Sequence, residues 1–305
     1  MRILVAYDGS SGAEQVLTLV KVIRWPRESA FRIVTVVEPN SMFVGPPMTP
    51  GALLPAPEVE AQISAYQEDQ VSQAARTLRS AGRTVEGVVL RGRPATVLVD
   101  EATQFNADVV IGGSRGHGPI SSLLLGSVSA EVVDHAPCPV LVARNAAISR
   151  VVFASDGSAP SAAAEAILSR WPVFETLPIH VVSVADVVEP WHTGIAPTMY
   201  RQVIEAHAKD LAQAKAEHTR IADETATRLR AAGRVAEGAM RTGDAAAEII
   251  AATQDSAADL VVIGSRGRTG VARMVLGSVA RNVLHGSIAS VLVVHDAGTP
   301  NARQS

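Results

Sequence analysis

The sequence predicts an α/β protein of two tandem, doubly wound, Rossmann-like domains, each a five-stranded parallel sheet flanked by helices. The chain has 305 residues, enough for two domains of about 150 residues each. Its hydrophobic content is 47% but its aromatic content only 4%, which suits helices packed on a buried parallel sheet rich in Ala, Val, Ile and Leu. Short apolar runs alternate with helical patterns, as in successive βαβ units.

An internal repeat divides the chain into two copies. RILVAYDGS at residues 2–10 matches RVVFASDGS at 150–158, and AGRTVEGVVLRG at 81–92 matches AGRVAEGAMRTG at 232–243. A repeat of about 150 residues is a domain duplication, because solenoid units of about 20 to 50 residues cannot bury a core alone. We therefore expect one domain at residues 1–146, a second at 147–297 and a flexible tail at 298–305.

Each element of the first copy has its own local pattern. Residues 3–7 form a short β run, and S-G-A-E at 11–14 is a capping-box pattern that opens a helix with apolar residues at 3.6-residue spacing. Further strands are predicted at residues 31–37, 85–90, 109–112 and 140–143, with a Pro-rich loop through 57 and helices to 81, over 94–104 and over about 127–135.

Three glycines recur at the same intervals in both copies. They are Gly113, Gly116 and Gly126 in the first copy, and Gly264, Gly267 and Gly277 in the second. A doubly wound sheet binds its ligand beyond the carboxyl ends of the strands, where the strand order reverses. Bare backbone in a loop at that edge can press against a ligand that a Cβ atom would hold off.

The residues beside these glycines suit an anionic ligand. Ser127 opens a helix whose exposed N–H groups and dipole favour phosphate, and Ser129 adds a hydroxyl in the same turn. Asp8 ends the first strand and would face the same crevice, although an Asp before Gly-Ser can also simply cap a turn. Arg115 could pair with phosphate or be a solvated loop residue.

The combined pattern resembles the universal stress protein family over both copies. It consists of G-x2-G-x9-G-S after an apolar strand that begins Ala-Asp, a following helix with HAPCPVLVAR, and a first strand that ends Asp-Gly-Ser. In ATP-binding members this pattern cradles the ribose and phosphates, the first-strand Asp helps to hold the nucleoside, and a second-strand backbone position contacts adenine. The resemblance thus implies ATP as the ligand, with Mg²⁺ as a candidate accompanying ion.

Carried over position by position, the resemblance and the repeat give a set of site residues for each copy. In the first copy they are Asp8, Val36, Gly113, Arg115, Gly116, Gly126, Ser127, Val128 and Ser129. In the second they are Asp156, Val184, Gly264, Arg266, Gly267, Gly277, Ser278 and Val279. Because Ala280 stands where the first copy has Ser129, we expect the first site to bind triphosphate more tightly.

These observations predict an ATP-binding regulatory protein of the stress response that holds nucleotide and is not an enzyme, slow hydrolysis remaining open. The net charge of −3 offers no general attraction to nucleic acid. The apolar runs are too short to span a membrane, no histidine cluster has metal-ligand spacing, and the single Cys138 fits a reducing cytoplasm. We expect the fifth strands to pair the two domains, and the chain to form a homodimer.

Two other functions remain open from the residues. One is a nucleotide-free protein-interaction module. The other is an α/β serine hydrolase, because G-x-S-x-G at residues 112–116 would make Ser114 the nucleophile, although the second copy has Ile263 in place of the first glycine. The glycine strings of a NAD-binding Rossmann turn and of a P-loop are absent.

Overall fold

The computed structural model describes residues 1–38, 57–79, 82–114, 125–186, 197–267 and 276–296. Within these ranges the chain forms two compact units, Met1–Ala147 and a second that begins at Ile148. Each is a doubly wound α/β unit with five parallel strands, which confirms the predicted fold class. No helix in the described ranges combines the length and apolar character needed to cross a bilayer.

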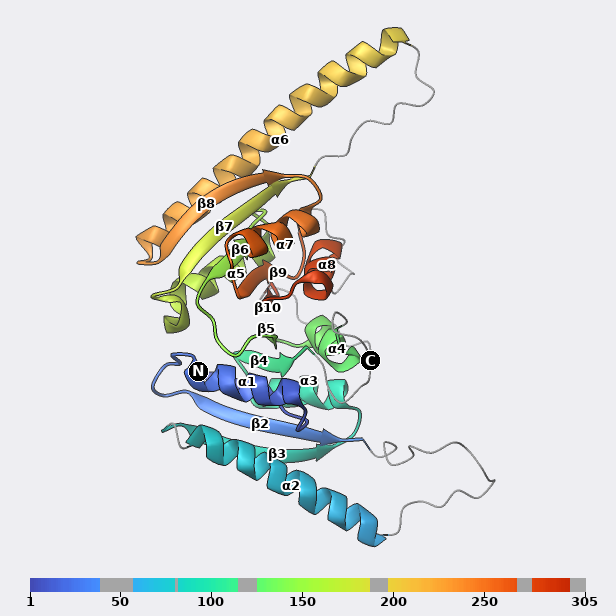
Figure 1. Cartoon of the computed structure of the whole chain (residues 1–305), viewed down its shortest axis with the longest axis vertical. Helices are drawn as coiled ribbons and strands as arrows, with labels where there is room; N and C mark the ends of the chain where they lie inside the picture. Colours follow the sequence, from blue (N-terminus) through green and yellow to red (C-terminus); the bar gives the residue numbers. More distant parts are fainter. Residues whose placement is uncertain (39–56, 80–81, 115–124, 187–196, 268–275, 297–305) are drawn as a thin grey trace, which may run out of the picture. The chain divides into compact units, whose positions relative to one another are not determined.

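The first unit alternates strands and helices along the chain (Figure 1). In order they are β1 (Arg2–Ala6), α1 (Ser11–Val22), β2 (Ala30–Val37), α2 (Pro57–Arg79), β3 (Thr84–Arg91), α3 (Pro94–Gln104), β4 (Val109–Gly113), α4 (Ser127–His135) and β5 (Val140–Ala143). The strand order is β3-β2-β1-β4-β5, and these neighbours are all parallel. Helices α1 and α2 pack together on the sheet, as do α3 and α4, so both faces are covered.

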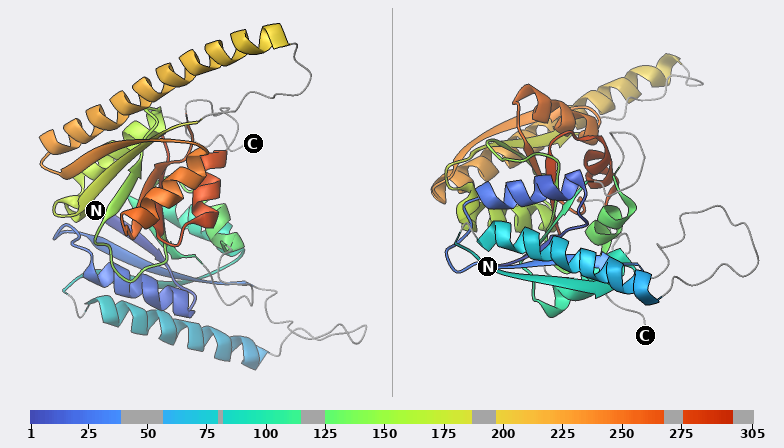
Figure 2. Two further views of the ribbon diagram at one scale, coloured as in Figure 1. Left: turned by 45° about the horizontal axis from the view of Figure 1, so that its top comes forward. Right: turned by 60° about the horizontal axis from the view of Figure 1, so that its bottom comes forward.

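The second unit repeats this plan. Its elements are β6 (Val151–Ala154), α5 (Ala159–Arg170), a 3₁₀ turn η1 (Pro172–Phe174), β7 (Pro178–Ala185), α6 (Pro197–Ala231), β8 (Val235–Thr242), α7 (Ala245–Asp255), β9 (Leu260–Gly264), α8 (Ser278–Gly286) and β10 (Ser290–Val294). The order β8-β7-β6-β9-β10 is again parallel throughout. Figure 2 shows α6 lying along β7 and β8 of its own unit.

The core of each unit lies along its central strands, which are hydrophobic on both faces. Ile3, Leu4 and Val5 of β1 are fully buried, and so are Val152 and Phe153 of β6. A strand covered by helices on both sides has no polar face, because neither set of alternating side chains reaches water. This is why the strands appear in the sequence as unbroken apolar runs.

The start of α1 corrects one sequence prediction. The N-cap is Ser10, whose hydroxyl oxygen accepts the Ala13 N–H at 3.2 Å, and Ser11 is the first helical residue. Glu14 does not close a capping box from Ser11, because its carboxylate accepts the hydroxyl of Tyr7 at 2.5 Å. The hydroxyl of Ser10, one residue before Ser11, has the right geometry to cap the helix. The Glu14 carboxylate accepts the Tyr7 hydroxyl in place of a backbone N–H.

Two matched glycines let the long helices approach the third strand of each sheet. A Cβ added at Gly238 of β8 would lie 2.7 Å from the Ala222 carbonyl oxygen and 3.2 Å from the Asp223 nitrogen of α6. A Cβ at Gly87 of β3 would lie 2.6 Å from Val71 Cγ1, a side-chain atom of α2, and 3.3 Å from the Val71 carbonyl oxygen. The glycine that both copies carry after Glu is therefore a packing requirement.

Pairing of the two copies through β5 and β10, and a homodimer, stay predictions from the sequence. The Pro-rich stretch at 39–56 and the tail at 297–305 lie outside the described residues. What the fold does provide is a pair of equivalent scaffolds whose corresponding positions can be compared directly.

We predict that Gly238→Ala destabilises the protein by about 1 to 3 kcal/mol, because the new methyl group meets helix backbone that cannot rotate away. Gly87→Ala should cost less, about 1 kcal/mol, because the closest atom there belongs to a side chain. Urea unfolding of both variants measures the difference. Gly112→Ala is the control, since its Cβ would stand 3.7 Å from Ala6 Cβ, an ordinary contact. Equal midpoints for Gly238→Ala and Gly112→Ala would contradict this account.

Candidate functional site

The first unit has a cavity where its strand order reverses. The chain runs from β1 outward to β2 and β3, then returns to add β4 on the other side of β1. Its crossover connections therefore leave the neighbouring ends of β1 and β4 in opposite directions, and a crevice opens between them. The cavity there has a volume of about 580 Å³.

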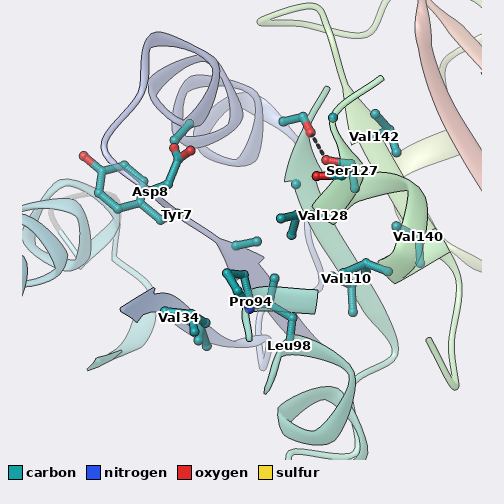
Figure 3. Close-up of a pocket in the computed structure, with 18 of the residues that line it drawn as sticks. Tyr7, Asp8, Val34, Pro94, Leu98, Val110, Ser127, Val128, Val140 and Val142 are labelled. Carbon is teal, nitrogen blue, oxygen red and sulfur yellow. Dashed lines mark hydrogen bonds between the residues drawn. The ribbon is translucent and has the colours of Figure 1, made fainter. Parts of the chain in front are cut away.

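The walls of the cavity are mostly apolar. Val34 and Val36 of β2, Val110 of β4, and Pro94 and Leu98 of α3 contribute hydrophobic surface. Figure 3 shows Tyr7 and Asp8 on one side of the cavity and Ser127 and Val128 on the other, with Pro94 and Leu98 between them at the base. A largely apolar pocket with a few converging polar groups is the usual form of a small-molecule site.

The polar end of the cavity is the start of α4. Its N-cap is Gly126, which has no side-chain oxygen to bond the first-turn N–H groups. The Gly126 N–H donates to the Ser114 carbonyl at 2.8 Å, and the Ser114 N–H donates to the Ala143 carbonyl at 3.2 Å, which ties the helix start to the ends of β4 and β5. An uncapped helix N-terminus at a cavity wall favours an anion.

Asp8 lies across the cavity from this helix start. One of its carboxylate oxygens accepts both the N–H of Ser10 at 3.0 Å and the Ser10 hydroxyl at 2.6 Å. The turn-capping role considered from the sequence is therefore real. It leaves the carboxylate exposed at the cavity wall, so the turn positions the group that a ligand would meet.

Tyr7 is a cavity residue that the sequence did not single out. It is 5% exposed, and its hydroxyl donates to Glu14. Burial, the hydrogen bond to Glu14 and the nearby negative charge raise the pKa of Tyr7 above its ordinary value. The ring is thus fixed beside the cavity, and the second copy, which has Ser155 at this position, lacks it.

Ser129 has a partner within the chain. Its hydroxyl donates to the carbonyl of Gly113 at 2.8 Å, linking the first turn of α4 to the last residue of β4. A phosphate oxygen would have to compete with this carbonyl for the proton. Ser129, Ser127, Val128, Gly126 and Gly113 all line the cavity, together with Asp8 and Val36. Arg115 and Gly116 lie outside the described residues.

The second unit packs the corresponding region closely. A Cβ added at Gly264 would lie 2.9 Å from the backbone of Pro160 in the first turn of α5, where the first unit has Gly12. A Cβ added at Gly267 would lie 2.9 Å from a carboxylate oxygen of Asp156. At Gly264, bare backbone is needed for the strand to meet a helix, a role that the sequence interpretation assigned to a ligand.

The remaining second-copy positions have close neighbours of their own. Ser158 donates its hydroxyl to the Arg266 carbonyl at 3.2 Å, and Asp156 accepts the N–H of Ser158 at 3.0 Å. Val184 is 9% exposed. The start of α8 still repeats that of α4, with Ser278 and Val279 after an N-cap Gly277 that makes no side-chain cap bond.

The backbone of Ser114 itself shows no sign of a nucleophile elbow, and the residues that follow it, 115–124, lie outside the described part of the chain. That motif places the serine on a strained turn, whereas the non-glycine residues with positive φ in the described ranges are Asn106 and Ala257. Its counterpart Ser265 is fully buried. The backbone of Ser114 is instead used to hold Gly126 at the helix start.

The described residues meet the requirements of neither a metal site nor a reactive thiol. Among the residues that the structure describes, no group of three or more His, Cys, Asp or Glu side chains could hold a metal ion. Cys138 is buried, and burial together with the charge of Asp108 raises the pKa of its thiol to about 12. The thiol is therefore protonated and inert near neutral pH.

Comparison with known proteins places this geometry in a family. A model of the universal stress protein family matches the chain twice, over residues 1–144 and 147–295. A universal stress protein of Thermus aquaticus is 34% identical over 142 residues, which are 47% of this chain and 97% of that protein. Universal stress protein Rv2005c of Mycobacterium tuberculosis is 30% identical over 227 residues, 70% of each chain.

A solved structure shares the fold over nearly the whole length. The crystal structure of a universal stress protein from Archaeoglobus fulgidus DSM 4304 is 20% identical, has a TM-score of 0.66, and is matched over 97% of this chain and 98% of that one. The tandem arrangement of two copies inferred from the internal repeat is thus confirmed.

We predict that Tyr7 ionises at a higher pH than an unperturbed tyrosine, for the reasons given above. Because its folded pKa is raised, its contribution to stability is complete below the unfolded pKa of about 10 and is lost only as the pH rises through the folded value. Absorbance titration of wild type and Tyr7→Phe identifies the ionisation of Tyr7. Glu14→Gln should lower the pH at which Tyr7 ionises, and an unchanged pH in that variant would refute the role of Glu14.

Proposed function

The chain belongs to the universal stress protein family, and we propose that it is a cytoplasmic regulatory protein of the stress response that binds ATP in its first unit and holds it without rapid hydrolysis. The observation that carries this proposal is the cavity at the strand reversal, which joins apolar walls to an uncapped helix N-terminus. A nucleotide has the same division into a flat apolar base and an anionic phosphate chain.

Each part of ATP has a matching part of the cavity. The base fits between the apolar side chains of β2 and α3, with Val36 at the position that the family resemblance pairs with adenine. Asp8 suits the ribose hydroxyls, because a carboxylate accepts hydrogen bonds from both. The phosphates belong at Gly126 and Ser127, which line the cavity at the uncapped start of α4.

Magnesium would arrive with the phosphates. Among the described residues lining the cavity, Asp8 is the one carboxylate, and Mg²⁺ at nucleotide sites is commonly held by one or two carboxylates and the phosphate oxygens. When bound, the ion would neutralise phosphate charge. The chain itself supplies the orientation, through the turn that fixes Asp8 and the backbone that fixes α4.

We propose that the first unit binds ATP more tightly than the second for two reasons. The hydroxyl of Ser129 has no counterpart, because Ala280 is 2% exposed and has only a methyl group. In addition, Pro160 and Asp156 lie so close to the glycines of the second unit that an added Cβ would stand 2.9 Å from either of them. These contacts leave little room between the strand end and the helix in the second unit.

We predict that native protein binds ATP at one tight site and that Asp8→Asn weakens this site by about tenfold or more, since a hydrogen bond to a charged group contributes about 1.5 to 3 kcal/mol. Asparagine keeps the oxygen that accepts the Ser10 N–H, so the turn survives. Titration calorimetry with ATP and Mg²⁺ measures the change, and NAD and a short oligonucleotide serve as competing ligands.

Asp156→Asn is the matched control, because it alters the equivalent turn of the second unit and should leave the tight site unchanged. An equal loss in both variants would show that the two units share the binding. Failure of wild type to bind any adenine nucleotide, with none released from natively purified protein, would favour the nucleotide-free interaction module.

We predict that steady-state ATP turnover stays well below about 1 per second, the low end of ordinary enzymes. Phosphoryl transfer needs a positioned base or a group that orients water, and Asp8 already accepts two hydrogen bonds from Ser10. Phosphate release under saturating Mg-ATP measures the rate. Faster turnover that disappears in Asp8→Asn would overturn the holding role and make Asp8 catalytic.

A further inference from the structure

The second unit has a hollow beside the amino-terminal ends of its strands β7 and β8. Its volume is about 610 Å³, and it is lined by the amino-terminal parts of β7 and β8, the end of α7, Arg150, and Arg241 near the carboxyl end of β8. Pro178, Ile179, Val235 and Ala236 form apolar surface, and His180 and Arg241 add nitrogen-bearing side chains. All of these residues belong to the second unit.

Comparison with the first unit explains why the hollow exists. Ser256 ends α7 as Phe105 ends α3, each donating its N–H to the residue four positions earlier, and each followed by a residue with φ near +48° or +49°. The side chain at this position is thus a hydroxymethyl group in place of a benzyl group. Ala252 similarly replaces Glu101 one turn earlier.

In the first unit an aromatic ring occupies the corresponding space. The Phe105 ring lies under two guanidinium groups, with Arg32 at 4.4 Å and Arg2 at 5.6 Å from its centroid. Both distances are within the range of a cation–π contact. Arg2 is anchored there by donating to the Phe105 carbonyl at 2.9 Å.

The second unit retains the nitrogen-bearing side chains that surround this ring, here called the frame, but not the ring itself. Arg150 donates to the carbonyl of Ser256, as Arg2 does to that of Phe105, and His180 takes the place of Arg32 on the second strand. His180 contacts Glu237 at 3.1 Å, as Arg32 contacts Glu86 at 2.6 Å. The groups that would face an aromatic ring are in place around an open volume.

The charges around the hollow favour an anionic ring compound. The side chains of His180 and Arg241 are 21% and 25% exposed, whereas those of Glu237 and Asp255, the carboxylates that line the hollow, are 79% and 65% exposed. Arg241 also pairs with Glu248, which is 31% exposed and is not part of the lining. The two lining carboxylates therefore lie at the rim, and His180 and Arg241 lie deeper. Arg150 forms no ion pair with a carboxylate within the described part of the chain, so its charge is available to an anion.

We infer that this hollow is a binding site for a small aromatic acid. The ring would occupy the space that Phe105 fills in the first unit, between Arg150 and His180, and the carboxylate would pair with Arg150. The inference does not depend on nucleotide binding, because none of the residues that line the hollow is among the candidate nucleotide positions of the second unit.

Phenylacetate is the probe, titrated into the full chain and followed by amide chemical shifts and calorimetry. We expect saturable shifts at the amino ends of β7 and β8 and at the end of α7, with one molecule bound per chain. Cyclohexylacetate has the same charge without an aromatic face and should bind about tenfold more weakly. Equal binding of both acids, or shifts that map elsewhere, would overturn the inference.

Two variants test the frame. Ser256→Phe copies the first unit and should abolish phenylacetate binding by filling the hollow, while leaving ATP affinity unchanged. Arg150→Gln removes the cation from an exposed position where misfolding is not at issue, and should weaken binding about tenfold. Phenylacetate binding that persists unchanged in either variant would refute the site.

The reciprocal variant combines Phe105→Ser with Glu101→Ala, because the second unit has Ser256 and Ala252 at these positions, and it opens the matching space between Arg2 and Arg32. It should raise the stoichiometry from one phenylacetate per chain to two. A thermal melt establishes that the variant is folded, and a folded variant that still binds only one molecule would show that the arginine frame alone does not recognise an aromatic acid.

Discussion

The covering of a parallel sheet by helices on both faces is the constraint on which the rest of this structure depends. Every crossover must carry a helix, and a strand order of β3-β2-β1-β4-β5 requires the chain to change direction once, between β1 and β4. At that point the crossover connections leave the strand ends in opposite directions, and the cavity beside Asp8 and Gly113 follows. The polar groups of the site are placed by the same constraint, since β1, β4 and α4 all have an end there.

The two copies use one scaffold to build different cavities. In the first unit a cavity lies at the carboxyl ends of the strands, while Phe105 fills the space at the amino ends. In the second unit Pro160 packs against Gly264 at the carboxyl ends, and a hollow lies beside Ser256 at the end of α7. Backbone register is common to both, so a few exchanges between small and large side chains decide where each unit can accept a ligand.

Glycine illustrates how one residue type meets several requirements within a single motif. At Gly238 the missing Cβ admits the backbone of α6, and at Gly264 it admits the first turn of α5, since an added atom would lie 2.7 or 2.9 Å from main-chain atoms. At Gly126 the absence of a side chain leaves the N-terminus of α4 uncapped. Repetition of a glycine pattern thus preserves the fold of both copies, and its meaning for a ligand has to be judged at each position.

The sequence by itself determined the fold class, the duplication and the order of the elements, because apolar runs, helical periodicity and the internal repeat are local signals. It also placed Asp8 and the start of α4 at one edge of the sheet, since the carboxyl ends of parallel strands converge. Only the tertiary structure decided that Ser10 rather than Ser11 caps α1, that Ser129 bonds Gly113, and that Pro160 packs against Gly264. Those outcomes depend on atoms distant in the chain coming within a few tenths of an ångström of a clash or a hydrogen bond, a distance that spacing along a sequence does not encode.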